Sequence, residues 1–64
     1  MIPRIRFTNE GDVLLNDKET PYHIKKYNNQ YEIWCGKHIV SLPIDYLKDA
    51  KEACKKMILK EINQ

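Results

Sequence analysis

The chain has 64 residues, of which 42% are hydrophobic and 31% are charged, and its formal net charge is +2. This composition is typical of a globular domain, and a chain this short forms a single domain, residues 1–64, with one small core. It leaves little room for a deep cofactor pocket, which disfavours an enzyme. The mildly basic charge permits an anionic partner without requiring one.

The sequence also bears on the compartment. Met1–Arg6 lacks the apolar stretch and cleavage site of a secretory signal, and the apolar runs are too short to span a membrane. We therefore expect a cytoplasmic protein. Its richness in Lys, Ile and Asn is typical of AT-rich genomes and fits a phage or other mobile-element protein.

Residues 1–16 predict an amino-terminal hairpin. Hydrophobic and polar residues alternate from 2 to 8, as in a half-buried strand, and 9–11 form a three-residue loop that ends in glycine. A loop of this length places the apolar side chains on one face, with Phe7 opposite Val13 and Ile5 opposite Leu15. The polar residues 16–21, which end in proline, predict a loop.

Residues 22–42 predict a three-stranded meander. Asn28-Asn29 suits a type I′ turn and Gly36-Lys37 a type II′ turn. These turns place Ile24 opposite Ile33, and Trp34 between His23 and Ile39. The face richer in apolar residues carries Tyr22, Ile24, Tyr31, Ile33, Cys35, Val40 and Leu42. The other face carries His23, Lys25, Tyr27, Gln30, Glu32, Trp34, Ile39 and Ser41.

Residues 46–62 predict a helix, with Asp45 as its N-cap. Its apolar side chains recur at spacings of three and four: Leu47, Ala50, Cys54, Met57, Ile58 and Ile62. Together these elements predict an α+β fold, an antiparallel sheet of about five short strands in two hairpin units followed by one C-terminal helix. The helix would cover the face that contains Ile33.

Trp34, Ile39, Tyr27 and His23 are then left on the face away from the helix. Such an aromatic and aliphatic patch has two interpretations. Either the amino-terminal hairpin folds over Trp34 and Ile39, or the patch is a recognition surface for a partner. Aromatic side chains near basic groups suit either a protein or nucleic-acid bases.

The three strands with Trp34 in the middle, and the helix opened by Leu47-Lys48-Asp49-Ala50-Lys51, resemble two DNA-binding families. These are the plant ethylene-response-type domain and the arm-site-binding domain of tyrosine integrases, and the resemblance covers residues 22–60. It implies that the exposed sheet face enters the DNA major groove, with His23, Lys25, Glu32 and Trp34 facing DNA. Those families place several arginines on this face. Here only Lys25 is present, so Arg4 and Arg6 would have to supply the remaining basic groups.

The candidates for other chemistry are few. Cys35 and Cys54 predict reduced core thiols, with a zinc site that includes His38, or a disulfide, as the alternative. The helix lysines Lys48, Lys55, Lys56 and Lys60 predict a solvated face, with phosphate contact as the alternative. Neither histidine has a catalytic partner nearby, and no glycine-rich phosphate loop exists.

We therefore expect a non-enzymatic binding protein with no cofactor, metal, membrane or small-molecule substrate. The first hypothesis is that it occludes a host protein through Trp34, Ile39, Tyr27 and His23. The second is a DNA-binding module that uses the same face with Lys25, Arg4 and Arg6.

Overall fold

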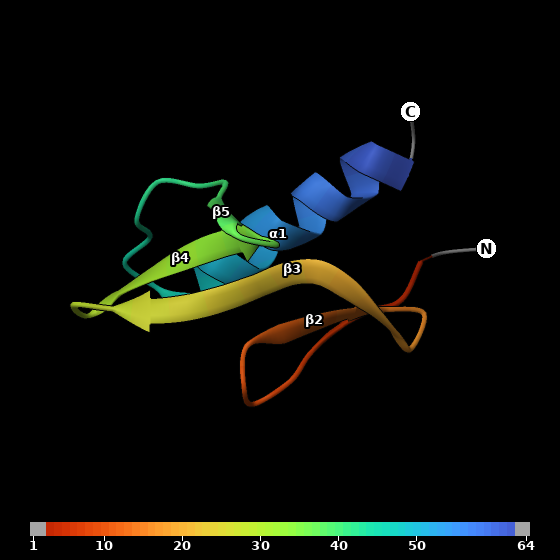
Figure 1. Cartoon of the computed structure of the whole chain (residues 1–64), viewed down its shortest axis with the longest axis horizontal. Coiled ribbons are helices and arrows are strands. Elements are labelled where there is room, and N and C mark those ends of the chain that lie inside the picture. Colours follow the sequence, from red (N-terminus) through yellow and green to blue (C-terminus); the bar gives the residue numbers. More distant parts are fainter. Residues whose placement is uncertain (1–2, 63–64) are drawn as a thin grey trace.

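The computed structural model describes residues 3–62. Within them five strands form one antiparallel sheet in the order β1-β2-β3-β4-β5, and one helix follows. The helix lies against one side of the sheet (Figure 1). This confirms the predicted α+β fold. The elements are β1 (Ile5–Phe7), β2 (Asp12–Leu15), β3 (Lys18–Tyr27), β4 (Gln30–Cys35), β5 (His38–Ile39) and α1 (Leu47–Ile62).

The predicted register of the first hairpin is confirmed, with Phe7 opposite Val13. Gly11 in its loop has a φ of 92°, and its carbonyl accepts a hydrogen bond of 2.8 Å from the backbone N–H of Ile24. A Cβ at Gly11 would lie 2.3 Å from the Ile24 carbonyl oxygen. Only glycine therefore fits where this loop meets β3.

The register between β3 and β4 is also confirmed, with Ile24 opposite Ile33 and His23 opposite Trp34. Asn28 and Asn29 both have positive φ, 51° and 63°, as a type I′ turn requires. Gly36 has a φ of 63°, which suits the first central position of the predicted type II′ turn.

The predicted loop at 16–21 is wrong, because β3 begins at Lys18. Asn16 and Asp17 have φ values of 51° and 66°, so they form a further tight turn that pairs β2 with β3. The two predicted hairpin units are therefore joined edge to edge in one sheet.

Pro21 lies inside β3 because the pairing with β2 is irregular there. The register shifts between Asp12 and Leu14, and the Thr20 hydroxyl donates to the Val13 carbonyl at 2.8 Å. On the other side the Pro21 carbonyl accepts from the Gly36 N–H at 2.8 Å. A proline is tolerated at such a bulge, where its missing N–H breaks no regular ladder bond.

The predicted core positions of Val40 and Leu42 are also wrong. β5 ends at Ile39, and Ile44 rather than Leu42 pairs with Tyr31. The Ser41 hydroxyl accepts a hydrogen bond of 3.1 Å from the Ile33 N–H. The residue that pairs with Tyr31 is therefore two positions later in the chain than predicted. Val40 is consequently 40% exposed and Leu42 84% exposed.

The helix begins at Leu47, so Asp45 does not occupy the predicted N-cap position. The Asp45 carboxylate instead accepts a hydrogen bond of 2.9 Å from the Gln30 side-chain amide. The predicted apolar stripe is buried in its middle and exposed at both ends. Its buried residues are Ala50, Cys54 and Ile58, its half-buried residue is Met57, and its exposed residues are Leu47 and Ile62.

The core lies between the helix and one face of the sheet. Its buried residues are Val13, Tyr22, Ile24, Ile33, Ala50, Cys54 and Ile58, with Ile5, Phe7, Leu15 and Tyr31 among the half-buried side chains packed against them. The apolar face of the amino-terminal hairpin thus joins the helix-side core. The interpretation in which that hairpin folds over Trp34 and Ile39 is wrong.

Within residues 3–62 no helix is long and apolar enough to cross a membrane.

Candidate interaction surface

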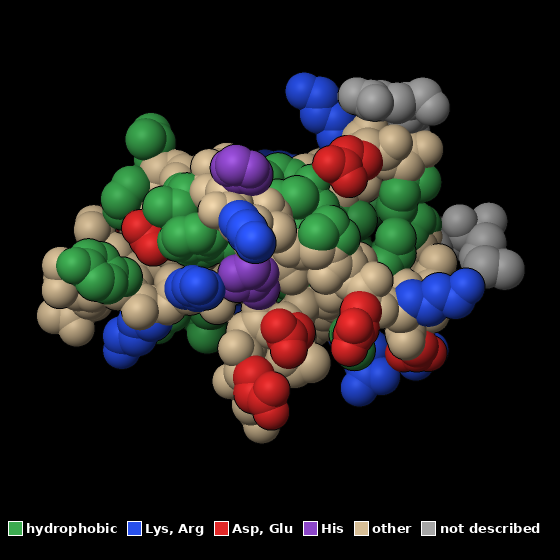
Figure 2. All heavy atoms as spheres, viewed as in Figure 1, with side chains coloured by type: hydrophobic (Ala, Val, Ile, Leu, Met, Phe, Trp, Pro, Cys, Tyr) green, Lys and Arg blue, Asp and Glu red, His purple; other side chains and the backbone are tan. Residues whose placement is uncertain are grey.

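A row of side chains crosses the sheet face that points away from α1. The strand register aligns Asp12 of β2, His23 of β3, Trp34 of β4 and Ile39 of β5. Because directly opposed residues project to the same face, these four side chains are neighbours. Figure 2 shows hydrophobic, basic, acidic and histidine side chains together over the sheet, in the view of Figure 1.

Trp34 is half-buried by side chains of this same face. The His23 ring is stacked beside the indole, with the ring centroids 6.1 Å apart and an angle of 16° between the planes. The Lys25 ammonium lies 4.3 Å from the centroid of the Trp34 ring, a cation–π contact. The indole N–H donates to Glu32 at 3.4 Å. These contacts hold the ring in one orientation.

The apolar part of the surface extends beyond Trp34. Ile39 is 50% exposed and Tyr27, at the end of β3, is 65% exposed. In the segment between β5 and the helix, Leu42 is 84% exposed and Tyr46 is 69% exposed. In Figure 2 hydrophobic side chains gather on the left, over the β3–β4 turn and the 40–46 segment.

Leu42 and Tyr46 were missed as surface candidates. The alternating pattern of 38–42 placed Leu42 in the core, and the helical spacing started at Tyr46. Pro43, which lacks the N–H that a continued strand would need, predicted a strand end after Leu42, but it did not indicate the earlier end at Ile39.

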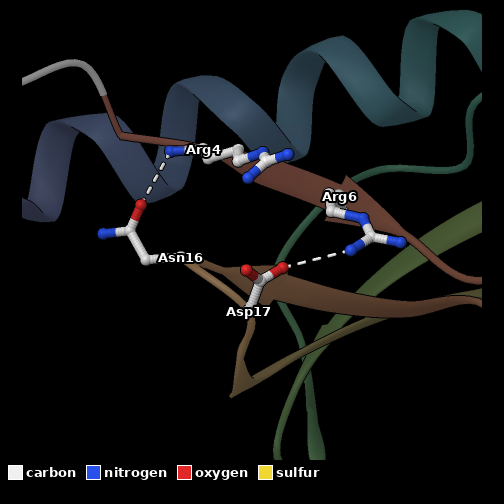
Figure 3. Close-up of polar contacts among 4 residues, drawn as sticks. All are labelled: Arg4, Arg6, Asn16 and Asp17. Carbon is white, nitrogen blue, oxygen red and sulfur yellow. Dashed lines mark hydrogen bonds and ion pairs between the residues drawn. The ribbon is translucent and has the colours of Figure 1, made fainter.

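The structure does not bring Arg4 and Arg6 to Trp34. Arg6 is in β1, and two strands separate β1 from β4, which corresponds to roughly 14 Å across the sheet. The Arg6 guanidinium pairs with Asp17 at 3.1 Å, and the Arg4 backbone N–H donates to the Asn16 side chain at 3.0 Å (Figure 3). Both contacts join the start of the chain to the β2–β3 turn.

The charges on this face are mixed. The register places Lys25 opposite Glu32, and Asp12 opposite His23. Glu19 lies opposite Leu14, which itself lies opposite Arg6, so it shares the face with that arginine. Carboxylates are therefore interspersed with the cations, and phosphate groups would meet repulsion as well as attraction.

The two thiols are on the helix side. Cys54 is fully buried and Cys35 is half-buried, and both are free. Burial, followed by the nearby Cys35, raises the pKa of Cys54 from its usual 9.0 to about 11. Cys35 lies opposite His38, as predicted. Within residues 3–62 no three His, Cys, Asp or Glu side chains are grouped to hold a metal ion.

Tyr22 ties the end of the helix to the sheet. Its hydroxyl donates to the carboxylate of Glu61, and this hydrogen bond raises the pKa of Tyr22 above its usual range, followed by burial. Glu61, which interrupts the apolar pattern of the helix, therefore has a structural partner. This contact belongs to the core and not to the candidate surface.

Comparisons of the chain with protein-family models, with curated proteins and with solved structures gave no match.

Proposed function

We propose that this chain is a small non-enzymatic binding protein that occludes a host protein in the cytoplasm through the sheet face opposite α1. The observation that carries the proposal is Trp34, half-buried but held in place by His23, Lys25 and Glu32 on a face that the helix leaves open. A pre-oriented aromatic side chain loses little conformational entropy on binding, and such residues often dominate interface energetics.

Ile39 and Tyr27 extend this surface and supply apolar area around the indole. A mixed set of charges around an apolar centre suits a protein partner, because each charged group can meet an opposite one at the rim. An origin in a phage or another mobile element fits the residue composition and the small size.

Binding to DNA through the same face is the second hypothesis, and the geometry supports it less well. DNA binding depends on Arg4 and Arg6, which lie at the β1 edge of the sheet, far from Trp34. Arg6 is also paired with Asp17. Lys25, the cation beside Trp34, has Glu32 as its cross-strand neighbour.

Affinity capture at two salt concentrations separates the hypotheses. Immobilised protein is incubated with host lysate and with duplex DNA, and Trp34→Ala is compared with the matched control Ile62→Ala, which truncates an exposed apolar side chain at the end of the helix. We expect one host protein to be retained at high salt, lost with Trp34→Ala and kept with Ile62→Ala. Retention of DNA that decreases steeply with salt, without a captured protein, would favour the second hypothesis.

A further inference from the structure

A groove lies on the helix side of the molecule, away from Trp34, between the first hairpin and the start of α1. Its volume is about 320 Å³. The β1–β2 turn with Gly11 forms one wall and Leu47 with Lys51 the other, while Ile24 and Tyr31 of the sheet contribute the floor. The groove exists because the loop is anchored on β3 at Gly11 while α1 begins only at Leu47.

The lining combines apolar side chains with cations. Phe7, Ile24 and Leu47 supply apolar surface, and Lys26 and Lys51 bring ammonium groups to it. A volume of about 320 Å³ lies at the lower end of the range for ligand pockets, roughly 300–1,000 Å³. It therefore suits one large side chain rather than an extended cofactor.

The cations continue along the helix. The ammonium groups of Lys51 and Lys55 lie 5.6 and 6.0 Å from the centroid of the Phe7 ring, so the ring holds both near the groove. A second hollow shares Leu47 and Lys51 with the groove and is also lined by Lys48, Glu52 and Lys55. Four lysines thus border two adjoining hollows, against the carboxylates of Glu10 and Glu52.

These lysines have no carboxylate partner in the part of the chain that the structure describes. The Arg6–Asp17 pair is the salt bridge found within residues 3–62, so no carboxylate there lies within 4.0 Å of the ammonium of Lys26, Lys51 or Lys55. Converging cations without partners repel one another, and an anionic ligand would relieve that repulsion.

We propose that this groove binds an acidic peptide segment of a protein partner, with one large apolar side chain on the floor and flanking carboxylates on the lysines. The apolar floor and the single-side-chain volume favour a peptide over a phosphate backbone, which has no apolar group to place there. The site is on the helix side and is independent of the proposed role of Trp34.

Fluorescence anisotropy tests this with a dye-labelled peptide that carries one phenylalanine flanked by glutamates. Two reference peptides replace either the glutamates by glutamine or the phenylalanine by alanine, and a single-stranded oligonucleotide of equal charge is the nucleic-acid probe. We expect the acidic peptide to bind at least about tenfold more tightly than each of these three probes. One charge-assisted contact can supply this difference from the glutamine peptide, and burial of the phenyl ring can supply it from the alanine peptide.

Variants locate the binding. Lys26→Glu should weaken peptide binding about tenfold, whereas Lys37→Glu, the same charge change in the β4–β5 turn, should change it little. Leu47→Ala should weaken peptide binding and Trp34→Ala should not. A negative result for the groove can therefore be distinguished from a negative result for the Trp34 face. Equal loss with Lys26→Glu and Lys37→Glu, or tighter binding of the oligonucleotide, would overturn the proposal. Circular dichroism confirms that each variant is folded.

Discussion

Trp34 is half-buried by neighbours on its own sheet face, and Lys25 is the neighbour that lies over the ring. A flexible lysine covers the indole in a different way from a packed core, because its side chain can change conformation without disturbing the sheet. Under the proposed function, the ring is screened from water in the free protein and becomes accessible to a partner.

The change Lys25→Ala tests this arrangement. It should raise the quenching of Trp34 fluorescence by acrylamide and shift the emission to the red, because the side chain that screens the indole is removed. The free energy of unfolding should decrease by about 0.5–1 kcal/mol, the size of an exposed cation–π contact. Trp34 is the single tryptophan, so the signal is unambiguous. Unchanged quenching, relative to a Lys37→Ala control, would contradict the contact.

Strand pairing was predictable where short turns determine it. The Asn28-Asn29 turn and the loop that ends at Gly11 have the lengths and residue types that set the register on either side. The Asn16-Asp17 turn was missed because a polar run that ends at Pro21 also resembles a loop. The bulge that accommodates Pro21 depends on a contact from the Thr20 hydroxyl to β2, which no local pattern reveals.

The end of the sheet was mispredicted for a related reason. Alternation alone extends the third strand to Leu42, whereas in the structure the Ser41 hydroxyl accepts the Ile33 N–H and Ile44 pairs with Tyr31. The burial of Ile33 and Ile58 was predictable from periodicity because both lie in the middle of their elements, where the position of the ends matters little.

Alanine substitutions distinguish core from surface in these elements. Ile33→Ala and Ile58→Ala should each lower the free energy of unfolding by about 2–5 kcal/mol, since both side chains are buried. Leu42→Ala should change it by no more than about 0.5 kcal/mol, because that side chain is exposed. Urea denaturation measures all three. If Leu42→Ala lowers the free energy of unfolding as much as Ile33→Ala does, Leu42 is buried and the third strand extends to residue 42.

The buried thiol of Cys54 makes the free energy of unfolding depend on pH. Its pKa is raised from 9.0 to about 11 in the fold, so the folded state holds a proton that the unfolded state loses. The contribution of Cys54 to stability is complete below pH 9 and decreases as the pH rises from about 9 to about 11.

A thiol-reactive dye measures the same burial directly. At pH 8 the folded protein should label quickly at no more than Cys35, and Cys54 should react only in denaturant, because its thiol is both buried and protonated. The variant Cys35→Ser isolates Cys54. Fast labelling of folded Cys35→Ser would show that Cys54 is not buried between α1 and the sheet.

The molecule as a whole presents two surfaces of different character. On the sheet face, Trp34 is fixed in orientation by its neighbours and is surrounded by charges of both signs. On the helix side, the groove has an apolar floor that is bordered by lysines. The sequence indicated the first surface, because two-residue alternation assigns Trp34 and Ile39 to the face without the helix. It could not indicate the groove, whose walls come from residues about forty positions apart.

Site-specific photocrosslinking tests the sheet-face role of the molecule most directly. The photoreactive residue p-benzoylphenylalanine is placed at position 39 on the sheet face or, as the matched control, at position 60 on the exposed side of α1, and each protein is irradiated in host lysate. We predict one protein adduct from position 39, absent when Trp34→Ala is added, and none from position 60. An adduct from position 60 alone, or one from position 39 that survives Trp34→Ala, would contradict binding through this face.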